Sequence, residues 1–542
     1  DQGGTLLIRR RSMRCANLNL IAGVPVCAVA VNVPASPAGE DIMQISSSYK
    51  CVSLVVALGA ICSATVTLSP AADWPQHQHD AARTGYSPDR VDPPYRTRWV
   101  WLNGQGLQKG PPPYMLTRAR DTSGSMQVVV ADGKVFFGTT EGVFYALDAG
   151  TGAELWRYEV GWPIVATAAF ADGKVVFTCQ DKHVYCLSGE GGQLAWKFRT
   201  GAGIWTAPAI RDGRVFVTSR DCGAYALDLA TGKQIWKADT SGPILTTPAV
   251  AGGKVFLGSE DCCAYAFDAR TGKQLWKTPL PGGSFYMKWP VPVGEVVFFR
   301  MMPQYAALET DQEAERRLAD VGDAGWPAER EAILAHLAKH PTRKTLFSLD
   351  TETGREKYTV PMLMAHANGC VPCPPVVAPG RRVYTIFRVG KSSLFHGAPT
   401  FGTRFACDVS RIDLETGDRV RLPLRPVKLG VGADNTGELS IGGGIMFVDH
   451  RYFVSKAFDL KTGRFYPLIM NRESEATPPR SPNWLWTREQ APNHPSTETF
   501  TPHRGYGVWG VSPAVIAAGR VYCNQLGGAI VCLDGGKTED KP

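Results

Sequence analysis

The sequence lacks several patterns that would assign a function directly. No Cys-x-x-Cys-His motif occurs among its 14 cysteines, which excludes covalent attachment of a c-type haem. Cys370-x-x-Cys373 has no second copy, so no four-cysteine zinc site is completed. The 58 Lys and Arg form no basic block and exceed the 50 Asp and Glu by only eight, so we expect no nucleic-acid partner.

A long uninterrupted apolar run is also missing. The best candidate, residues 51–68, is diluted by Ser and Thr and no basic stop follows it, so no membrane anchor is predicted. Met43 and Lys50 precede this run and Ser69-Pro-Ala71 suits small-residue cleavage, which together predict a secretory signal peptide. Bulky Ile61 before Cys62 argues against a lipid anchor. We therefore expect a periplasmic or secreted bacterial protein, in which disulfides can persist.

The central feature of the chain is a pattern that repeats every forty residues between Val135 and Lys277. Each copy contains an aromatic run ending in Asp or Ser, a Gly-containing turn and a Trp. The four copies are Tyr145-Ala-Leu-Asp148 to Trp156, Tyr185-Cys-Leu-Ser188 to Trp196, Tyr225-Ala-Leu-Asp228 to Trp236, and Tyr265-Ala-Phe-Asp268 to Trp276. Since each copy holds four short strands and three turns, the repeat predicts the blade of a β-propeller, with the Trp residues docking blades together.

We name the strands of a blade A to D from the inside outwards. Weaker copies follow at Leu349-Asp350, Ile412-Asp413 and Phe458-Asp459, and the last, 521–534, lacks a D strand. The isolated strand around Trp99 can fill that gap and pair the two ends of the chain. The prediction is an all-β, eight-bladed propeller of four-stranded antiparallel blades, closed by pairing of N- and C-terminal strands.

The predicted organisation places other segments around this propeller. They are a mis-start (1–42), a signal peptide (43–71), an irregular lead-in (72–95), the propeller (96–537) with a helical insertion at 301–344 and a Pro/Ser/Thr-rich loop at 470–510, and a tail (538–542). Within the insertion, 311–321 and 327–340 have helical patterns, and Ile333, Leu334 and Leu337 form an apolar stripe expected to pack on the rim. A partner-binding helix is the alternative.

Loop lengths distinguish the two faces of the ring. Strands alternate in direction, so A–B and C–D turns share one face, here called the turn face, and B–C and D–A connections share the other, the loop face. The A–B and C–D turns are all tight, whereas the long insertions fall in B–C and D–A connections. Because binding residues concentrate on loops held by a rigid scaffold, we expect function on the loop face.

Candidate site residues gather on that face. The B–C turns carry Asp181-Lys182-His183, Asp221-Cys222 and Asp261-Cys262-Cys263, and the D–A loops carry Trp205, Lys288-Trp289, His366, Cys370, Cys373, His503-Arg504 and Trp509. Such convergence of His, Cys, Asp and Trp indicates a ligand or metal site. A metal site built from His366, Cys370, Cys373 and His183 is one hypothesis, and a local disulfide between Cys370 and Cys373 is the other.

The remaining cysteines leave alternatives open. Cys262-Cys263 could form a strained bond between neighbours, or one of them could pair with Cys222 at the next blade. Cys523 and Cys532 face each other if the hairpin turns at Gly527-Gly528, which suits a cross-strand disulfide or packed thiols. Cys179 and Cys186 lie out of register on one hairpin.

The repeat, Tyr-Ala-Leu-Asp-x-x-Thr-Gly-x-x-x-Trp after Asp-Gly-x-Val-Phe, resembles the pyrroloquinoline-quinone-type propeller repeat, closely from Asp132 to Lys277 and more loosely to Asp534. Two branches of that family are relevant. Quinoprotein alcohol dehydrogenases stack their quinone between a Trp and adjacent disulfide-bonded cysteines, beside calcium. The propeller subunit of the outer-membrane barrel assembly machinery, BamB, binds protein and no quinone.

The resemblance implies two functions. We expect a monomeric binding or scaffold module for a protein or a small ligand, acting through the loop face. The alternative is a quinone-dependent alcohol or sugar dehydrogenase with calcium. In that alternative Asp261 is the base, and the cofactor contacts come from Cys262, Cys263, Cys222, Asp221, Trp205, Trp289, Trp509 and Arg504. The plain repeat turn around Cys262-Cys263 and the lack of clear calcium ligands favour the scaffold, although fold alone does not decide function.

Overall fold

The structure is a computed structural model, and it describes residues 72–101, 126–285, 288–301, 326–362, 374–389, 406–422, 439–448, 456–467, 512–524 and 530–536. Contacts divide the chain into two units, 1–67 and 68–542, of which the first lies wholly outside these ranges. All that follows concerns the second unit. The predicted mis-start and signal peptide therefore remain predictions.

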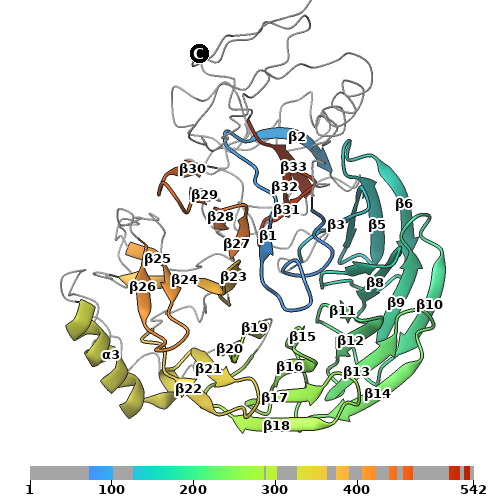
Figure 1. Ribbon diagram of the computed structural model, residues 1–542. Coiled ribbons are helices and arrows are strands. Elements are labelled where there is room, and N and C mark those ends of the chain that lie inside the picture. Colours follow the sequence, from blue (N-terminus) through green and yellow to red (C-terminus); the bar gives the residue numbers. More distant parts are fainter. Residues whose placement is uncertain are drawn as a thin grey trace, which may run out of the picture. The chain divides into compact units, whose positions relative to one another are not determined.

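The described strands form eight sheets arranged as a ring of blades (Figure 1). Each of the first four blades has four antiparallel strands in the spatial order of the sequence, with strand A nearest the axis. Their strands are β3 (Val129–Ala131), β4 (Lys134–Gly138), β5 (Val143–Asp148), β6 (Glu154–Glu159); β7 (Ala169–Ala171), β8 (Lys174–Thr178), β9 (His183–Ser188), β10 (Leu194–Arg199); β11 (Ala209–Arg211), β12 (Arg214–Thr218), β13 (Gly223–Asp228), β14 (Gln234–Asp239); β15 (Ala249–Ala251), β16 (Lys254–Ser259), β17 (Cys263–Asp268) and β18 (Gln274–Pro279).

Blades five to eight follow the same plan in the part of the chain that is described. Their strands are β19 (Val291–Val293), β20 (Val296–Arg300), β21 (Leu346–Asp350), β22 (Glu356–Tyr358); β23 (Val376–Ala378), β24 (Arg382–Val389), β25 (Ala406–Ile412), β26 (Arg419–Arg421); β27 (Leu439–Gly442), β28 (Ile445–Val448), β29 (Lys456–Asp459), β30 (Phe465–Pro467); β31 (Val515–Ala517), β32 (Arg520–Asn524) and β33 (Ile530–Asp534). The eight-bladed all-β propeller is confirmed.

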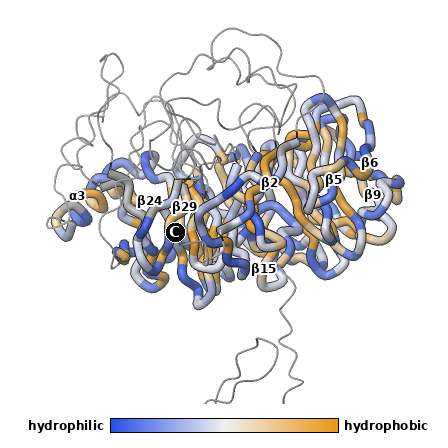
Figure 2. The backbone as a smooth tube through the Cα atoms, turned by 90° about the horizontal axis from the view of Figure 1, so that it is seen from above, coloured by the Kyte–Doolittle hydropathy of each residue, from blue (hydrophilic) through white to orange (hydrophobic). Residues whose placement is uncertain are grey.

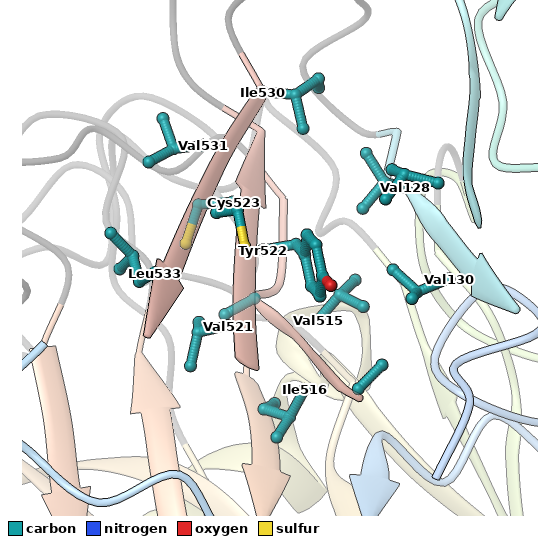
Figure 3. Packing of buried hydrophobic residues seen from close by; sticks show 14 of the residues in the cluster. Val128, Val130, Val515, Ile516, Val521, Tyr522, Cys523, Ile530, Val531 and Leu533 are labelled. Atoms are coloured by element: carbon teal, nitrogen blue, oxygen red, sulfur yellow. The ribbon is translucent and has the colours of Figure 1, made fainter. Parts of the chain in front are cut away.

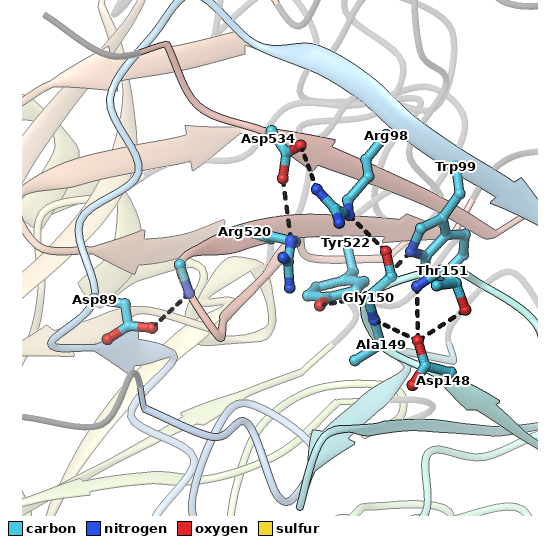
Figure 4. A network of polar contacts seen from close by, with 11 residues as sticks. Asp89, Arg98, Trp99, Asp148, Ala149, Gly150, Thr151, Arg520, Tyr522 and Asp534 are labelled. Carbon is cyan, nitrogen blue, oxygen red and sulfur yellow. Dashed lines mark hydrogen bonds and ion pairs between the residues drawn. The ribbon is translucent and has the colours of Figure 1, made fainter.

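The ring closes as predicted. β2 (Arg96–Trp101) pairs antiparallel with β33 as the fourth strand of blade eight, with Trp99 opposite Cys532. Ion pairs of 3.0 Å from Arg98 and Arg520 to Asp534 join β2 to β33 and β32 to β33 (Figure 4). Valines and Ile516 of blade eight pack with Val128 and Val130 of blade one in one buried cluster (Figure 3). Pairing the termini covers what would otherwise be two open sheet edges.

Blade-to-blade docking explains the repeated Trp. In blades eight and one to four, the Trp of the D strand donates its indole N–H to a carbonyl of the next blade, for example Trp236 to Ala269 at 3.1 Å. Its ring lies against the Gly of the next Thr-Gly turn, where a Cβ on Gly272 would sit 2.7 Å from the indole of Trp236. The equivalent donations, from Trp99, Trp156, Trp196 and Trp276, range from 2.9 to 3.3 Å. The structural role predicted for these residues is confirmed.

The lead-in, Ala72 to Asp89, lies along the axis of the ring and contacts every blade. Its short strand β1 (Tyr86–Ser87) pairs parallel with β27 near the centre of Figure 1. Backbone and side-chain hydrogen bonds join it to blades one to four and six to eight, through Val130, Phe170, Ile210, Val250, Val377, Ile441 and Ala518. His77 contacts Trp289 of blade five. We call residues 72–89 the axial plug.

The strand order confirms the two faces inferred from loop length. Residues 301–344 join B to C in blade five, and their helix α3 (Trp326–Lys339) confirms the second predicted helix, followed by the 3-10 turn η4 (Pro341–Arg343). Ile333 and Leu337 are buried, and Arg330 pairs with Asp418 of blade six at 2.5 Å, so the stripe packs on the rim. The other predicted helix, 311–321, and the loop 470–510 lie outside the described residues.

The arrangement of cysteines differs from the prediction. Cys532 lies opposite Tyr522, and Cys523 opposite Val531, so the two cysteines do not face each other. None of the seven cysteines whose side chains the structure describes is in a disulfide. Hydrophobic strand centres alternate with hydrophilic turns (Figure 2). No helix among the described residues is long and apolar enough to cross a membrane.

Candidate functional site

The B–C turns of blades two to four share one geometry. In each, an Asp accepts the amide N–H two residues later and the hydroxyl of a Tyr four residues later, as Asp221 does from Gly223 at 2.9 Å and Tyr225 at 2.6 Å. Asp181 binds His183 and Tyr185 in the same way, and Asp261 binds Cys263 and Tyr265. The three carboxylates therefore hold their turns in shape.

Asp261, the candidate base, is also bound by a cation. The Lys277 ammonium lies 3.1 Å from its carboxylate. Burial alone would raise the pKa of Asp261, but hydrogen bonds from Tyr265, Lys277 and the Cys263 amide outweigh it and lower the pKa. The pKa of Asp221 is lowered by a similar balance of burial against hydrogen bonds. A carboxylate held in this way is a weak proton acceptor, since a general base works best with a pKa near the working pH.

The cysteines of these turns are positioned by the backbone. Cys222 and Cys262 occupy the left-handed position of their turns, with φ of 67° and 61°, where Gly142 stands in blade one. The Cys262 thiol contacts the carbonyls of Gly282 and Gly283, and the Cys263 thiol contacts the carbonyl of Asp261. Neither a Cys262–Cys263 bond nor a bond to Cys222 is formed. Burial and neighbouring carboxylates raise the pKa of both adjacent thiols, so they are not activated thiolates.

The two described tryptophans of the prediction occupy different surroundings. Trp289 is 3% exposed, and its ring meets His77 of the axial plug edge-on at 4.5 Å between centroids. Trp205 is half-buried on the loop face, with the exposed guanidinium of Arg220 over its ring at 5.6 Å. His183 lies beside Asp181, 3.3 Å from its carboxylate. Trp509, Arg504, His366, Cys370 and Cys373 lie outside the described residues.

Sequence reasoning did not single out Trp162. It is 59% exposed, the most exposed large apolar side chain among the described residues, and it begins the D–A loop between blades one and two. At the same position of the next three repeats stand Ala202, Gly242 and Gly282. This departure from the forty-residue pattern is the signal that could have found it.

The loops of Trp162 and Trp205 meet at the B–C turn of blade two. The Gln180 amide donates to the carbonyl of Pro163 at 3.1 Å, and the Ile204 amide donates to the carbonyl of Cys179 at 3.3 Å. Lys182, in the same turn, is exposed, while Asp181 faces Tyr185. Trp162, Lys182, Trp205 and Arg220 thus lie on adjoining segments of the loop face, and we call these four residues the Trp–Arg patch.

Polar side chains hold the axial plug in the centre of the ring. The Arg83 side chain is fully buried and donates to the carbonyls of Pro208, Pro248 and His77 at 2.9 to 3.1 Å. Burial lowers the pKa of Arg83 to about 9. Burial and the charge of Arg83 hold the pKa of His77 well below its usual range. His77 is therefore neutral at physiological pH.

The described residues do not fit a quinone beside calcium. The adjacent cysteines are not joined into a stacking surface, and Trp289 presents its ring to His77. Within the described ranges, no group of three or more His, Cys, Asp or Glu could hold a metal ion. The residues predicted for the metal hypothesis are undescribed except His183, so that hypothesis stays a prediction.

A family model described as outer membrane protein assembly factor BamB matches residues 98–208 and 180–466, which is more than half of the chain. The chain belongs to this family. No curated protein sequence matches it.

Solved structures of quinoprotein dehydrogenases show the same fold. Quinohemoprotein alcohol dehydrogenase from Comamonas testosteroni is 13% identical, with a TM-score of 0.53 over 89% of this chain and 83% of that one. A europium-containing methanol dehydrogenase is 12% identical, with a TM-score of 0.51 over 85% and 98%. BamB from Moraxella catarrhalis is 12% identical, with a TM-score of 0.45 over 76% and 97%. At such identities the likeness concerns the fold alone.

Proposed function

We propose that this protein is an extracytoplasmic scaffold that binds a protein partner through its loop face, in the service of outer-membrane protein assembly. The observation that carries the proposal is the Trp–Arg patch. Trp162 is 59% exposed on a blade whose next three copies carry Ala or Gly at that place. Exposed Trp and Arg side chains are the types that dominate binding energy at protein interfaces.

The chemistry of the turns supports binding over catalysis. The carboxylates of Asp181, Asp221 and Asp261 are taken up by Tyr hydroxyls and turn amides, and the pKa of Asp221 and of Asp261 is lowered. The thiols of Cys262 and Cys263 have raised pKa values. These groups build a rigid platform, which lowers the entropy cost of forming an interface.

The proposal is tested with the outer-membrane assembly machinery of the source bacterium, purified in detergent. Its dissociation constant for the secreted protein is measured for wild type, Trp162→Ala and Trp205→Ala. Loss of an interface hot spot of about 2 kcal/mol weakens binding about thirtyfold. Leu275→Ala is the control, since Leu275 is 43% exposed on a D strand away from the patch.

Three outcomes would contradict the proposal: no binding, binding that both Trp variants leave unchanged, or equal losses in the Leu275 control. The oxidoreductase alternative is tested on the same preparation. Quinone and calcium are added, and the absorption spectrum and dye-linked alcohol oxidation are recorded. A bound chromophore with turnover would replace the scaffold proposal by the enzymatic one.

A further inference from the structure

Ala72, where the axial plug begins, is held on both sides. Its carbonyl accepts the Ala518 amide at 3.0 Å, and its own nitrogen donates to Oδ1 of Asp89 at 2.9 Å. The other oxygen of Asp89 accepts the Gly519 amide at 3.1 Å, and Figure 4 shows this carboxylate at the edge of blade eight. The A–B turn of blade eight thus fixes the nitrogen of Ala72 against a carboxylate on the turn face.

Negative charge is in excess around this nitrogen. Asp132 and Asp89 both lie close to Asp73, and the Asp132 amide donates to Asp73 at 3.4 Å. Lys134 pairs with Asp132 and Glu190, but within the described ranges no Lys or Arg pairs with Asp73 or Asp89. Burial first, and then the charges of Asp132 and Asp89, raise the pKa of Asp73, while the hydrogen bond from the Asp132 amide and the charge of His79 act in the opposite sense. A cation at the nitrogen of Ala72 would relieve this repulsion.

We propose that a signal peptidase cleaves the bond between Ala71 and Ala72, and that the α-ammonium group released on Ala72 forms an ion pair with Asp89. The sequence before this bond, Ser69-Pro-Ala71, has the small residues that such peptidases require. The 2.9 Å contact already made by the amide places the new charge beside its partner. This inference is independent of the proposed scaffold function.

The chemistry needs only water. Hydrolysis breaks the C–N bond between Ala71 and Ala72, the water oxygen joins the Ala71 carbonyl carbon to give a carboxylate, and Ala72 leaves as an amine. The amine takes up a proton, because a free α-amino group has a pKa of about 7.7–8.0. Cleavage one residue earlier would leave a neutral amide at Ala72 and no ion pair. The proposed ion pair therefore requires cleavage at this one bond.

The consequence is a link between processing and ring closure. Ala72 and Asp89 are the two ends of the axial plug, and both are bonded to the A–B turn of blade eight. Once the signal peptide is removed, an ion pair between Ala72 and Asp89 holds the axial plug in the axis of the ring. The uncleaved chain keeps the hydrogen bonds and lacks the charge.

The first test is the intact mass and N-terminal sequence of the protein secreted by its own bacterium, which we expect to begin at Ala72. The second is a double-mutant cycle by urea unfolding. Four proteins are compared: the processed form and a form extended by two residues before Ala72, each as wild type and as Asp89→Asn. We expect Asp89→Asn to change the unfolding equilibrium about two- to fivefold more in the processed form than in the extended one.

Asp92→Asn is the matched control, because Asp92 is a carboxylate of the same segment that pairs with Arg90 at 2.8 Å. Asp92→Asn should change the unfolding equilibrium equally in the processed and the extended form. The α-amino pKa of Ala72, read by nitrogen NMR of the processed wild type, should lie above its ordinary value. Another N-terminus, an ordinary α-amino pKa, or an Asp89→Asn effect of equal size in both forms would overturn the proposal.

Discussion

Gly272→Ala is expected to weaken the docking of one blade on the next. Gly272 has a φ of +74° and supports the Trp236 ring, so a methyl group meets two separate costs. The left-handed backbone costs about 1–2 kcal/mol for a residue with a Cβ. The methyl would also lie 2.7 Å from the ring of Trp236, which must move. Such overpacking costs about 1–3 kcal/mol.

The chain offers a matched control for the backbone cost. Gly213, in the A–B turn of blade three, has a φ of +69°, and a Cβ there would meet nothing within 4 Å. Gly213→Ala should therefore cost about 1–2 kcal/mol. Gly272→Ala should cost about 2–5 kcal/mol when the two penalties are combined. The difference isolates the contact with Trp236.

The assay is urea unfolding followed by tryptophan fluorescence, with the free energy of unfolding compared at equal m-value. A second control is Gly272→Ala combined with Trp236→Ala, which removes the ring. The Ala at 272 should then cost no more than the one at 213. Equal destabilisation by the two single Gly variants would refute the docking role assigned to the Trp-Gly contact.

Three further predictions concern the plug and the thiols. Arg83→Met should destabilise the protein by about 2–4 kcal/mol because it leaves buried carbonyls without donors, whereas Arg157→Met, whose guanidinium is exposed, should change unfolding by under about 1 kcal/mol. Burial lowers the pKa of His77 in the folded protein, so the free energy of unfolding is highest above pH 6.5 and falls as the pH drops below 6.5. Urea unfolding at pH 6.5 and 5.5 should show this fall in the wild type, and His77→Gln should reduce it by up to about 1.4 kcal/mol per pH unit. Alkylation of unfolded, unreduced protein should label both Cys262 and Cys263, and a peptide with neither labelled would contradict the thiol assignment.

The blades could be predicted because their period is a property of the chain itself. Where the repeats carry the Asp, Thr, Gly and Trp, these residues have fixed spacings and the structure uses them: Asp228 accepts from Thr231, and Trp196 docks on the turn that follows. Closure by the strand around Trp99 followed from the missing D strand of the last copy. The two faces followed from the alternating direction of the strands, and loop length distinguished one face from the other.

The axial plug could not be predicted in the same way. Its contacts are made by backbone groups and by polar side chains such as Gln76 and Arg83, which sequence patterns assign to exposed loops. Their partners lie 125 to 165 residues away, so no local spacing reveals them. Polar residues become buried here because the ring presents the inner edges of its A strands to the axis.

The register of the last hairpin, β32 and β33, was a second feature that the sequence did not predict. Cys523 pairs with Val531, so the strands pair one residue out of the register expected for a turn at Gly527-Gly528. A shift of one residue moves every side chain to the other face of a sheet. Cys523 and Cys532 are thereby separated. Trp162 of the Trp–Arg patch was missed for another reason, since it departs from the repeat in one copy only.

Site-specific photo-crosslinking tests the central claim that partners meet the loop face. A photoreactive amino acid is placed at Trp162 or Trp205 on that face, and at Asp172 or Asp212 in the A–B turns of the turn face. In living cells, the loop-face positions should yield a discrete crosslinked protein and the turn-face positions should yield none. Crosslinks of equal yield from both faces, or from Asp172 and Asp212 alone, would contradict the account.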